Sequence, residues 1–410
     1  MGEYMQSKVT MWYKDIKKLD VWEILFLIMV LSYAFFSTID IKIVNIINIC
    51  MLLLFLKSKK YCIKNNKINI LDKLLFFYSL LIIFRFLFNN GEELKGSIMA
   101  EYLAPIILFY IVRSIKVVRK YFKLIVAGLF ISIFISVAYS FFDAYQGVAR
   151  VDGFIFVMEF AEFAAMFSLG LIIVSLFKLK RMGTRLLLMG LSTLGFISMV
   201  MTKTRGVWLA YIFSMLIILL LRRKKYMMYF LILISILSSI IFLGDSVQES
   251  RYYKRLISIK DIEENASNTT RLRLWMGSMK IIEDNPFLGI GLNSFGDEIS
   301  KPKYDQGKIV STAHAHNNYL QIGVSTGIMG MILLILIHLY IIYYLIINYK
   351  THESSYIKKI NLLVLSFWLI YILHGLTEFT IEDMYTGRFV WFSLGLTYNL
   401  NNKKINKGVE

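Results

Sequence analysis

The chain has 410 residues, of which 57 % are hydrophobic and 15 % aromatic, with only three prolines. A water-soluble domain of this size would not be so apolar, and the mean hydropathy of +0.60 indicates a membrane-embedded protein instead. The formal net charge is +18 at pH 7. A basic protein of this kind could bind nucleic acid or membrane lipid, and the positions of the basic residues along the chain distinguish these two partners.

The predicted elements are apolar stretches of about 20 residues, each long enough to cross a ~30 Å hydrocarbon core as a helix. We expect an all-α, polytopic membrane protein with about twelve spans, at residues 22–39, 41–56, 71–89, 97–112, 122–142, 154–177, 184–203, 205–221, 226–244, 318–347, 360–377 and 385–400. The two cysteines, Cys50 and Cys62, give no disulfide framework.

Lysine and arginine cluster at the ends of these spans. The main clusters lie at residues 8–18, 57–67, 113–123, 178–185, 222–225, 350–359 and 403–407. With twelve spans every cluster falls on one side, which the positive-inside rule assigns to the cytoplasm, together with both chain termini. These basic residues are then topology signals that contact membrane lipids, and we expect no nucleic-acid partner.

One long connection divides the chain into three parts. They are about nine N-terminal spans (residues 1–244), an external loop with short helices (245–317) and about three C-terminal spans (318–410). The loop carries ten basic and ten acidic residues, unlike the cytoplasmic clusters. Loops of this length are usually functional, and this one shares the outer side with the turns at 143–153 and 378–385.

Four arginines are predicted on the outer side: Arg150, Arg205, Arg271 and Arg273. The last two lie on an expected helix over residues 269–284, which ends before a proline. Arginine presents a planar fork of N–H donors that does not deprotonate, as a site for a diphosphate requires. A single arginine near a span end more simply reaches toward lipid headgroups. Four of them, against the positive-inside trend, indicate an anion site.

The segment STAHAHNNYL holds His314 and His316 at the start of a long apolar run. A His-x-His pair can chelate zinc, but a catalytic zinc needs about three protein ligands and the segment offers no neighbouring carboxylate or cysteine. We therefore expect no metal. Neutral imidazole can take a proton from a sugar hydroxyl, which favours a general base. The alternative is a structural histidine at a helix entrance, with Asn317 and Asn318 as caps.

Three motifs, in order, resemble the O-antigen ligase and O-antigen polymerase family of bacterial envelope biogenesis. They are TKTRGVWLA, then TRLRLW followed by NPFLGIGLNSF, then His316-Asn317 separated by nine residues from Gly327. The resemblance covers roughly residues 145–395. From the residues alone, Gly327 and its neighbours Gly323 and Gly330 would simply permit close helix packing.

The resemblance implies a fold of the GT-C superfamily and transfer of a glycan from undecaprenyl diphosphate, with no nucleotide-sugar or metal cofactor. Carried over by position, Arg205 and Arg271 match the family's functional arginines and His316 its functional histidine. Arg150 matches an arginine often seen before a Gly-Phe pair. Where many members then have Pro-Asn, this chain reads FVMEFAEF, so the role of that segment is open.

The residues and the resemblance together predict a mechanism. Arg205 and Arg271, with Arg150, would hold the diphosphate and stabilise the leaving group, while His316 deprotonates the attacking hydroxyl and the product is inverted. We assign substrate-binding roles to a further set of residues, in which the two glutamates would orient the acceptor or the histidine: His314, Asn317, Arg273, Glu378 and Glu382.

Three functions fit this pattern. The first is ligation of a glycan onto a lipid A-core acceptor, and the second is polymerisation of an O-antigen or capsule-type glycan onto another lipid-linked repeat unit. The third, a small-anion transporter, is disfavoured because the charges gather on one face rather than along a path through the membrane. We expect the bacterial cytoplasmic (inner) membrane, an active site on its outer face, and as partners the lipid-linked donor, a glycolipid or lipid-linked acceptor, and membrane lipids.

Overall fold

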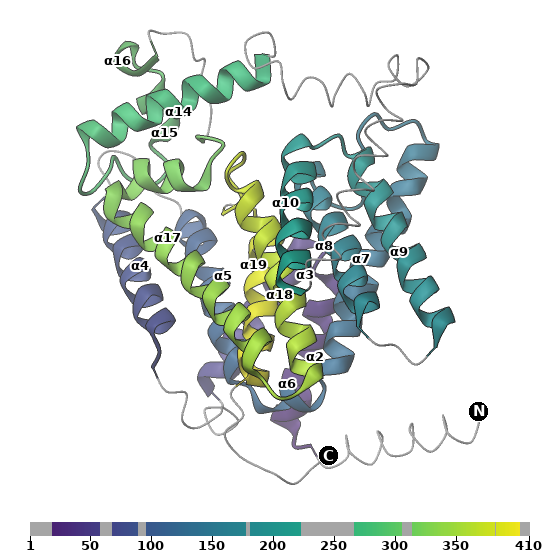
Figure 1. The fold of residues 1–410 in the computed structure, drawn as a ribbon. Helices are drawn as coiled ribbons and strands as arrows, with labels where there is room; N and C mark the ends of the chain where they lie inside the picture. The colour runs from purple at the N-terminus through teal and green to yellow at the C-terminus, as the bar shows by residue number, and fades with distance from the viewer. Residues whose placement is uncertain are drawn as a thin grey trace, which may run out of the picture.

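The computed structural model describes residues 19–57, 68–88, 96–177, 181–222, 266–305, 314–381 and 383–401. Within these ranges the chain is helical and has no strand, as Figure 1 shows. The all-α class is therefore confirmed for the described residues.

Each expected span except 226–244, which lies outside the described residues, coincides with a helix. The helices are α2 (Val21–Phe36), α3 (Ile41–Lys57), α4 (Ile70–Leu87), α5 (Gly96–Ser114), α7 (Phe122–Tyr145), α8 (Val157–Leu176), α9 (Met182–Met201), α10 (Arg205–Arg222), α17 (Asn318–Thr351), α18 (Ser355–His374) and α19 (Thr386–Asn401). Within the described residues, six of them (α7 to α10, α17 and α18) are long and apolar enough to cross a membrane. The protein is thus an integral membrane protein, and the number of twelve spans stays a prediction.

Among the described residues, four shorter or more polar helices are present, and they lie at the two ends of this bundle (Figure 1). They are α6 (Lys116–Lys120), α14 (Ala266–Asp284), α15 (Phe295–Ile299) and α16 (Pro302–Asp305). Helices α14 to α16 sit together at one end, and α6 is at the opposite end. The expected helix 269–284 is confirmed as α14, which begins three residues earlier and ends where expected.

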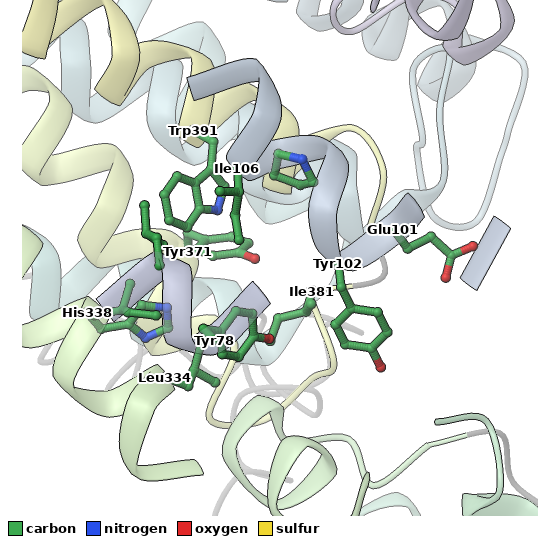
Figure 2. A pocket seen from close by; sticks show the side chains of 12 residues that line it. Tyr78, Glu101, Tyr102, Ile106, Leu334, His338, Tyr371, Ile381 and Trp391 are labelled. Atoms are coloured by element: carbon green, nitrogen blue, oxygen red, sulfur yellow. The ribbon is translucent and has the colours of Figure 1, made fainter. Parts of the chain in front are cut away.

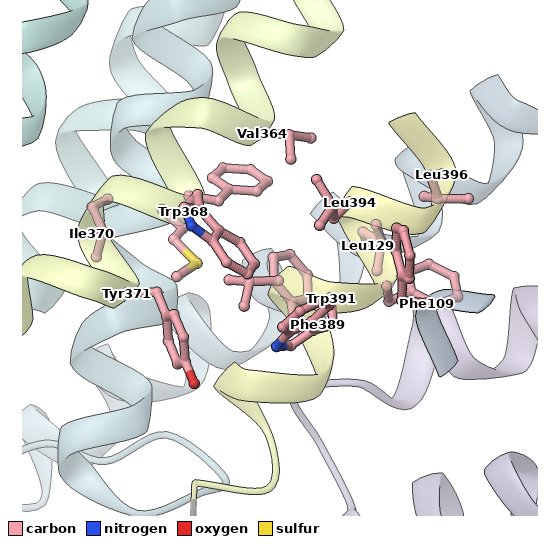
Figure 3. Close-up of a cluster of buried hydrophobic side chains, with 14 of the residues drawn as sticks. Phe109, Leu129, Val364, Trp368, Ile370, Tyr371, Phe389, Trp391, Leu394 and Leu396 are labelled. Carbon is pink, nitrogen blue, oxygen red and sulfur yellow. The ribbon is translucent and has the colours of Figure 1, made fainter. Parts of the chain in front are cut away.

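The centre of the bundle is made by α8, α18 and α19. These helices pack against one another and bury side chains on all sides, so their sequences are apolar around the whole helix. Figure 3 shows the aromatic residues where they meet. Trp368 and Trp391 pack edge to face with ring centroids 5.2 Å apart, and Phe109 of α5 contacts Trp391 at 5.8 Å. This rigid centre supports the turn between α18 and α19, where the candidate site lies.

Helix α17 is broken at Gly327, whose φ of 75° and ψ of −178° are not helical. The loop after α14 fits into the break: Ile328 N–H donates to the Pro286 carbonyl (2.8 Å) and Ile290 N–H to the Val324 carbonyl (2.8 Å). A Cβ on Gly327 would lie 2.4 Å from the Phe287 carbonyl oxygen, so no larger residue fits without a shift. The glycine serves a loop–helix junction, and the expectation of simple helix–helix packing is wrong here.

Candidate functional site

Three segments that are distant in the sequence meet at the carboxylate of Glu378, in the turn between α18 and α19. Its Oε1 lies 2.6 Å from Nδ1 of His316, just before α17, and its Oε2 lies 3.3 Å from Nη2 of Arg271 on α14. The Glu378 side chain is only 6 % exposed, whereas those of His316 and Arg271 are 27 % and 24 % exposed. A buried carboxylate thus orients an imidazole and a guanidinium that both reach the surface.

Asn317 begins α17 as its N-cap. The side-chain oxygen of Asn317 accepts hydrogen bonds from the Tyr319 and Leu320 N–H groups, and its amide donates to the Leu376 carbonyl (2.9 Å). Both ends of the Asn317 side chain are therefore used inside the protein. The cap predicted for this residue is present, while the binding role assigned to it stays a prediction.

Asn318 connects the start of α17 to the turn that carries Glu378. Its buried side-chain oxygen accepts from Thr380 N–H (2.8 Å) and its amide donates to the Thr380 hydroxyl (2.9 Å). Its backbone N–H donates to the Gly375 carbonyl (2.8 Å). These bonds hold residues 375–380 against α17, which is why Glu378 reaches His316. From the sequence, only a capping role was predicted for Asn318, and the pair of consecutive asparagines was the available signal.

The charge of Glu378 follows from these contacts. Burial raises the pKa of its carboxyl, but the hydrogen bond with His316 and the charges of His316, His374 and His314 together lower it to about 2. At neutral pH the carboxylate is ionised and can only accept hydrogen bonds. We therefore assign the proton of this hydrogen bond to Nδ1 of His316, so Nε2 is the ring nitrogen left to act on a substrate.

His314 lies beside His316, with ring centroids 4.3 Å apart. Nδ1 of His314 accepts a hydrogen bond from the His316 backbone N–H (3.3 Å) and lies 3.9 Å from Oε1 of Glu378. Burial and the neighbouring His316 and Arg271 lower the pKa of His314, against the opposite effect of Glu378. His314 is thus a neutral ring that supports the backbone of His316, whose φ of 48° lies in the left-handed region.

The two histidines and Glu378 bring their ligand atoms within 4.8 Å of one another. The segment around the histidines has no carboxylate of its own, but the fold brings that of Glu378 to them. Glu378 is 62 residues from His316 in the chain but in contact with it in the fold. Two imidazoles and one carboxylate are a donor set that suits zinc. The expectation of a metal-free site depends on the family resemblance alone and stays a prediction.

Arg205 and Arg271 converge on one face of α14. Arg205 is the first residue of α10, is 7 % exposed, and donates through Nη2 to Oδ1 of Asn268 (3.1 Å). Asn268 precedes Arg271 by three residues on α14, so both side chains leave the same face of that helix. The structure thus brings the two predicted arginines to one face of α14, with Arg205 buried and Arg271 partly exposed.

The other predicted residues take different positions. Arg150 donates through Nε to the Thr202 carbonyl (2.8 Å) and through Nη2 to the Thr204 hydroxyl (3.1 Å), so it supports the turn that leads into Arg205. Arg273 is exposed on α14, and two residues past Arg271 it faces another side of the helix. Glu382 lies outside the described residues.

The segment FVMEFAEF, whose role the sequence left open, contributes a second carboxylate–imidazole pair. Oε1 of Glu162 on α8 lies 2.7 Å from Nδ1 of His374, and the side chains are 0 % and 2 % exposed. A Cβ on Gly206 would lie 2.9 Å from Cδ2 of His374 and 2.5 Å from the Thr377 hydroxyl, so the pair packs against the first turn of α10. Sequence reasoning missed this support for Arg205, although acidic residues in an apolar span signal function.

A small cavity lies beneath the same turn, among α4, α5, α17, α18 and α19. Figure 2 shows it lined by Tyr78, His338, Tyr371 and Trp391. Its volume is about 30 Å³, which suits ordered water rather than a glycan or a lipid chain. This cavity is therefore too small for a large substrate, and the surface formed by His316, Arg271 and their neighbours stays the candidate site.

Fold and site together define a polytopic membrane protein with a basic, histidine-containing site at one end of its helical bundle. Residues 190–335 match the family model described as O-antigen ligase. This finding confirms the resemblance and supports the O-antigen ligase and polymerase family. The matched range contains Arg205, Arg271 and His316, but not Glu378. No curated protein matches the chain.

Proposed function

We propose that the protein transfers a glycan from undecaprenyl diphosphate to an acceptor sugar hydroxyl on the outer face of the bacterial cytoplasmic membrane. The family match supports glycosyl transfer of the O-antigen ligase and polymerase type. The observation that carries the proposal is the Glu378 carboxylate, which contacts both His316 and Arg271. A general base and a phosphate-binding cation are thereby held side by side.

His316 is the general base of this proposal. Its Nδ1–H is directed at Glu378, so Nε2 can take the proton of the acceptor hydroxyl as that oxygen attacks the anomeric carbon. The Glu378 carboxylate then stabilises the imidazolium that forms, as a buried carboxylate does in carboxylate–histidine pairs generally. Attack from the side opposite the departing diphosphate inverts the anomeric centre.

Arg271 and Arg205 hold the diphosphate. Nη2 of Arg271 contacts Glu378, and a guanidinium has five N–H donors, so one arginine can bind both the carboxylate and a phosphate oxygen. Arg205 lies one helical turn away along α14 through its bond to Asn268. These fixed positive charges stabilise the negative charge that grows on the leaving group, which is the task a metal ion performs in other phosphate sites.

We propose ligation onto a lipid A-core acceptor, with polymerisation onto a second lipid-linked repeat unit as the alternative; the printed description of the matched family, O-antigen ligase, supports the first. The test uses the purified chain in lipid nanodiscs with a lipid-linked glycan donor and, in separate reactions, lipid A-core or a second lipid-linked repeat unit. We expect product on the first acceptor, no loss with EDTA, and an inverted linkage by NMR. Product on the second acceptor alone would make the protein a polymerase.

His316→Ala should lower this transfer by about 10²- to 10⁴-fold, the range for a positioned general base. His314→Ala should cost much less, since His314 supports the backbone of His316 rather than facing the acceptor. Full activity of His316→Ala would contradict the base assignment. Equal losses in both variants, together with EDTA sensitivity, would indicate a metal site instead.

A further inference from the structure

A second, larger cavity lies where α6 joins α7. Figure 1 shows α6 at the end of the bundle opposite α14 and the candidate site. We call this second cavity the α6–α7 cavity; Arg119, Lys120, Tyr121 and Lys123 line it, with Tyr356 of α18. Its volume is about 290 Å³, close to the lower limit of about 300 Å³ for small-ligand pockets. Nothing in the proposed transfer reaction uses it.

Among the described residues, the lining of the α6–α7 cavity has three basic side chains and no acidic one. Nε of Arg119 donates to the Asn399 carbonyl at the end of α19 (3.2 Å). Nζ of Lys120 lies 5.4 Å from the Tyr121 ring centroid, and Nζ of Lys123 lies 5.6 Å from that of Tyr356. Contacts of this kind hold cations in place, so the cavity presents a positioned positive charge to an anion.

The Tyr121 hydroxyl is an independent sign of a ligand. The Tyr121 side chain is 6 % exposed, and its buried oxygen has no hydrogen-bond partner within the described part of the chain. A buried hydroxyl without a hydrogen-bond partner costs free energy, which a hydrogen bond to a ligand would recover, and Tyr121 is one of the residues that line the cavity. Tyr121 is also the residue before α7, so the first N–H groups of this long helix, which favour anions, lie at the same cavity.

We propose that the α6–α7 cavity binds the phosphate headgroup of an anionic phospholipid. The cavity lies at the ends of α7, α18 and α19, the level at which headgroups meet membrane-spanning helices. Its remaining lining residues are apolar and suit the glycerol and acyl carbons: Phe122, Leu124 and Leu400. Basic pockets between helices at the cytoplasmic side are sites of this chemistry, and we expect this end of the bundle to face the cytoplasm.

Native mass spectrometry of the full chain in detergent, titrated with phosphatidylglycerol, tests the proposal. We expect one tightly bound lipid per chain, and no equivalent binding of phosphatidylcholine. Lys120→Gln with Lys123→Gln should weaken binding by about 30-fold, from about 1 kcal/mol for each basic residue. Tyr121→Phe keeps the ring but removes the hydroxyl, and should weaken binding by about fivefold or more. Lys350→Gln, an exposed lysine at the same end, is the matched control and should change nothing.

Several results would overturn the proposal. An equal loss of binding in Lys350→Gln would mean that surface charge alone attracts the lipid. Unchanged binding in Tyr121→Phe would mean that the Tyr121 hydroxyl makes no hydrogen bond to the lipid, and the specific site would be refuted. Displacement of the lipid by inorganic phosphate at an equal concentration would assign the cavity to a free anion. None of these binding measurements depends on glycan transfer. A result that refutes the lipid site is therefore distinguishable from a result that refutes the proposed function.

Discussion

Replacing Glu378 by glutamine removes the carboxylate that contacts both His316 and Arg271 in the candidate site. The carboxylate accepts from Nδ1 of His316 and from Nη2 of Arg271, through different oxygens. Glutamine keeps the shape but offers one oxygen and one NH₂ group. If the NH₂ group faces His316, the ring must move its proton to Nε2 and loses the lone pair that the base needs. If it faces Arg271, the guanidinium loses its anchor.

The size of the effect follows from the charge of Glu378. Its pKa of about 2, against 4.5 for a free side chain, corresponds to about 3 kcal/mol of net stabilisation of the ionised form. Because the folded pKa is the lower one, this stabilisation is fully present above pH 4.5 and is lost as the pH falls toward 2. The wild-type protein should therefore unfold more easily as the pH falls from 4.5 toward 2. Glu378→Gln should be less stable than the wild type at pH 7, and its stability should change less over that same pH range.

Two assays check these expectations. Glycan transfer by Glu378→Gln should fall by about 10²- to 10⁴-fold at pH 7, because the general base loses its orientation. Thermal unfolding in detergent between pH 7 and pH 2.5 measures the stability difference. Glu298→Gln is the matched control, since Glu298 of α15 pairs with Lys301 in an exposed contact rather than with His316. A Glu378→Gln variant that folds and transfers at the wild-type rate would refute the proposed role of the carboxylate.

Three further predictions follow from single positions. Arg271→Lys keeps the charge but loses the planar fork, so transfer should fall at least tenfold at normal protein abundance, whereas Arg273→Lys should transfer nearly normally; equal rates in a transfer assay would move the phosphate site elsewhere. Once both native cysteines are replaced, a cysteine at Ser300 should react with an impermeant thiol reagent in intact cells and one at Ser354 should not; the reverse pattern would overturn the expected topology. Gly327→Ala should destabilise the protein by about 1–3 kcal/mol, measured by thermal unfolding, because its backbone is left-handed and crowded; an unchanged unfolding temperature would mean that the loop shifts at no cost.

The fold was largely predictable because apolar length and hydropathy are local properties. Helix bounds such as Phe122–Tyr145 and Arg205–Arg222 agree with the expected spans to within a few residues. The break at Gly327 was not predictable from hydropathy, because the loop that fills it comes from about 40 residues earlier. An apolar run indicates a helix, but it does not show which of the helix's backbone groups will form hydrogen bonds with another segment of the chain.

The candidate site was predictable in its residue types and less so in its contacts. His316, Arg205 and Arg271 were selected by chemistry and by the family pattern, and the structure places them in connected positions. Glu378 was named as a residue that would orient either the acceptor or the histidine, and its contact with His316 favours the second role. The Asn318 bonds that produce this contact depend on tertiary structure, and no spacing in the sequence encodes them.

The sequence motifs around Arg271, Gly327 and His316 are also connected by hydrogen bonds in the fold. The loop NPFLGIG fixes α14 against the break in α17 through the bonds at Ile328 and Ile290. This contact sets where Arg271 lies relative to the start of α17. At that start Asn318 holds the turn that carries Glu378. The histidine, the arginine and the carboxylate are therefore positioned by one helix, so a change at Gly327 should disturb the base and the phosphate site together.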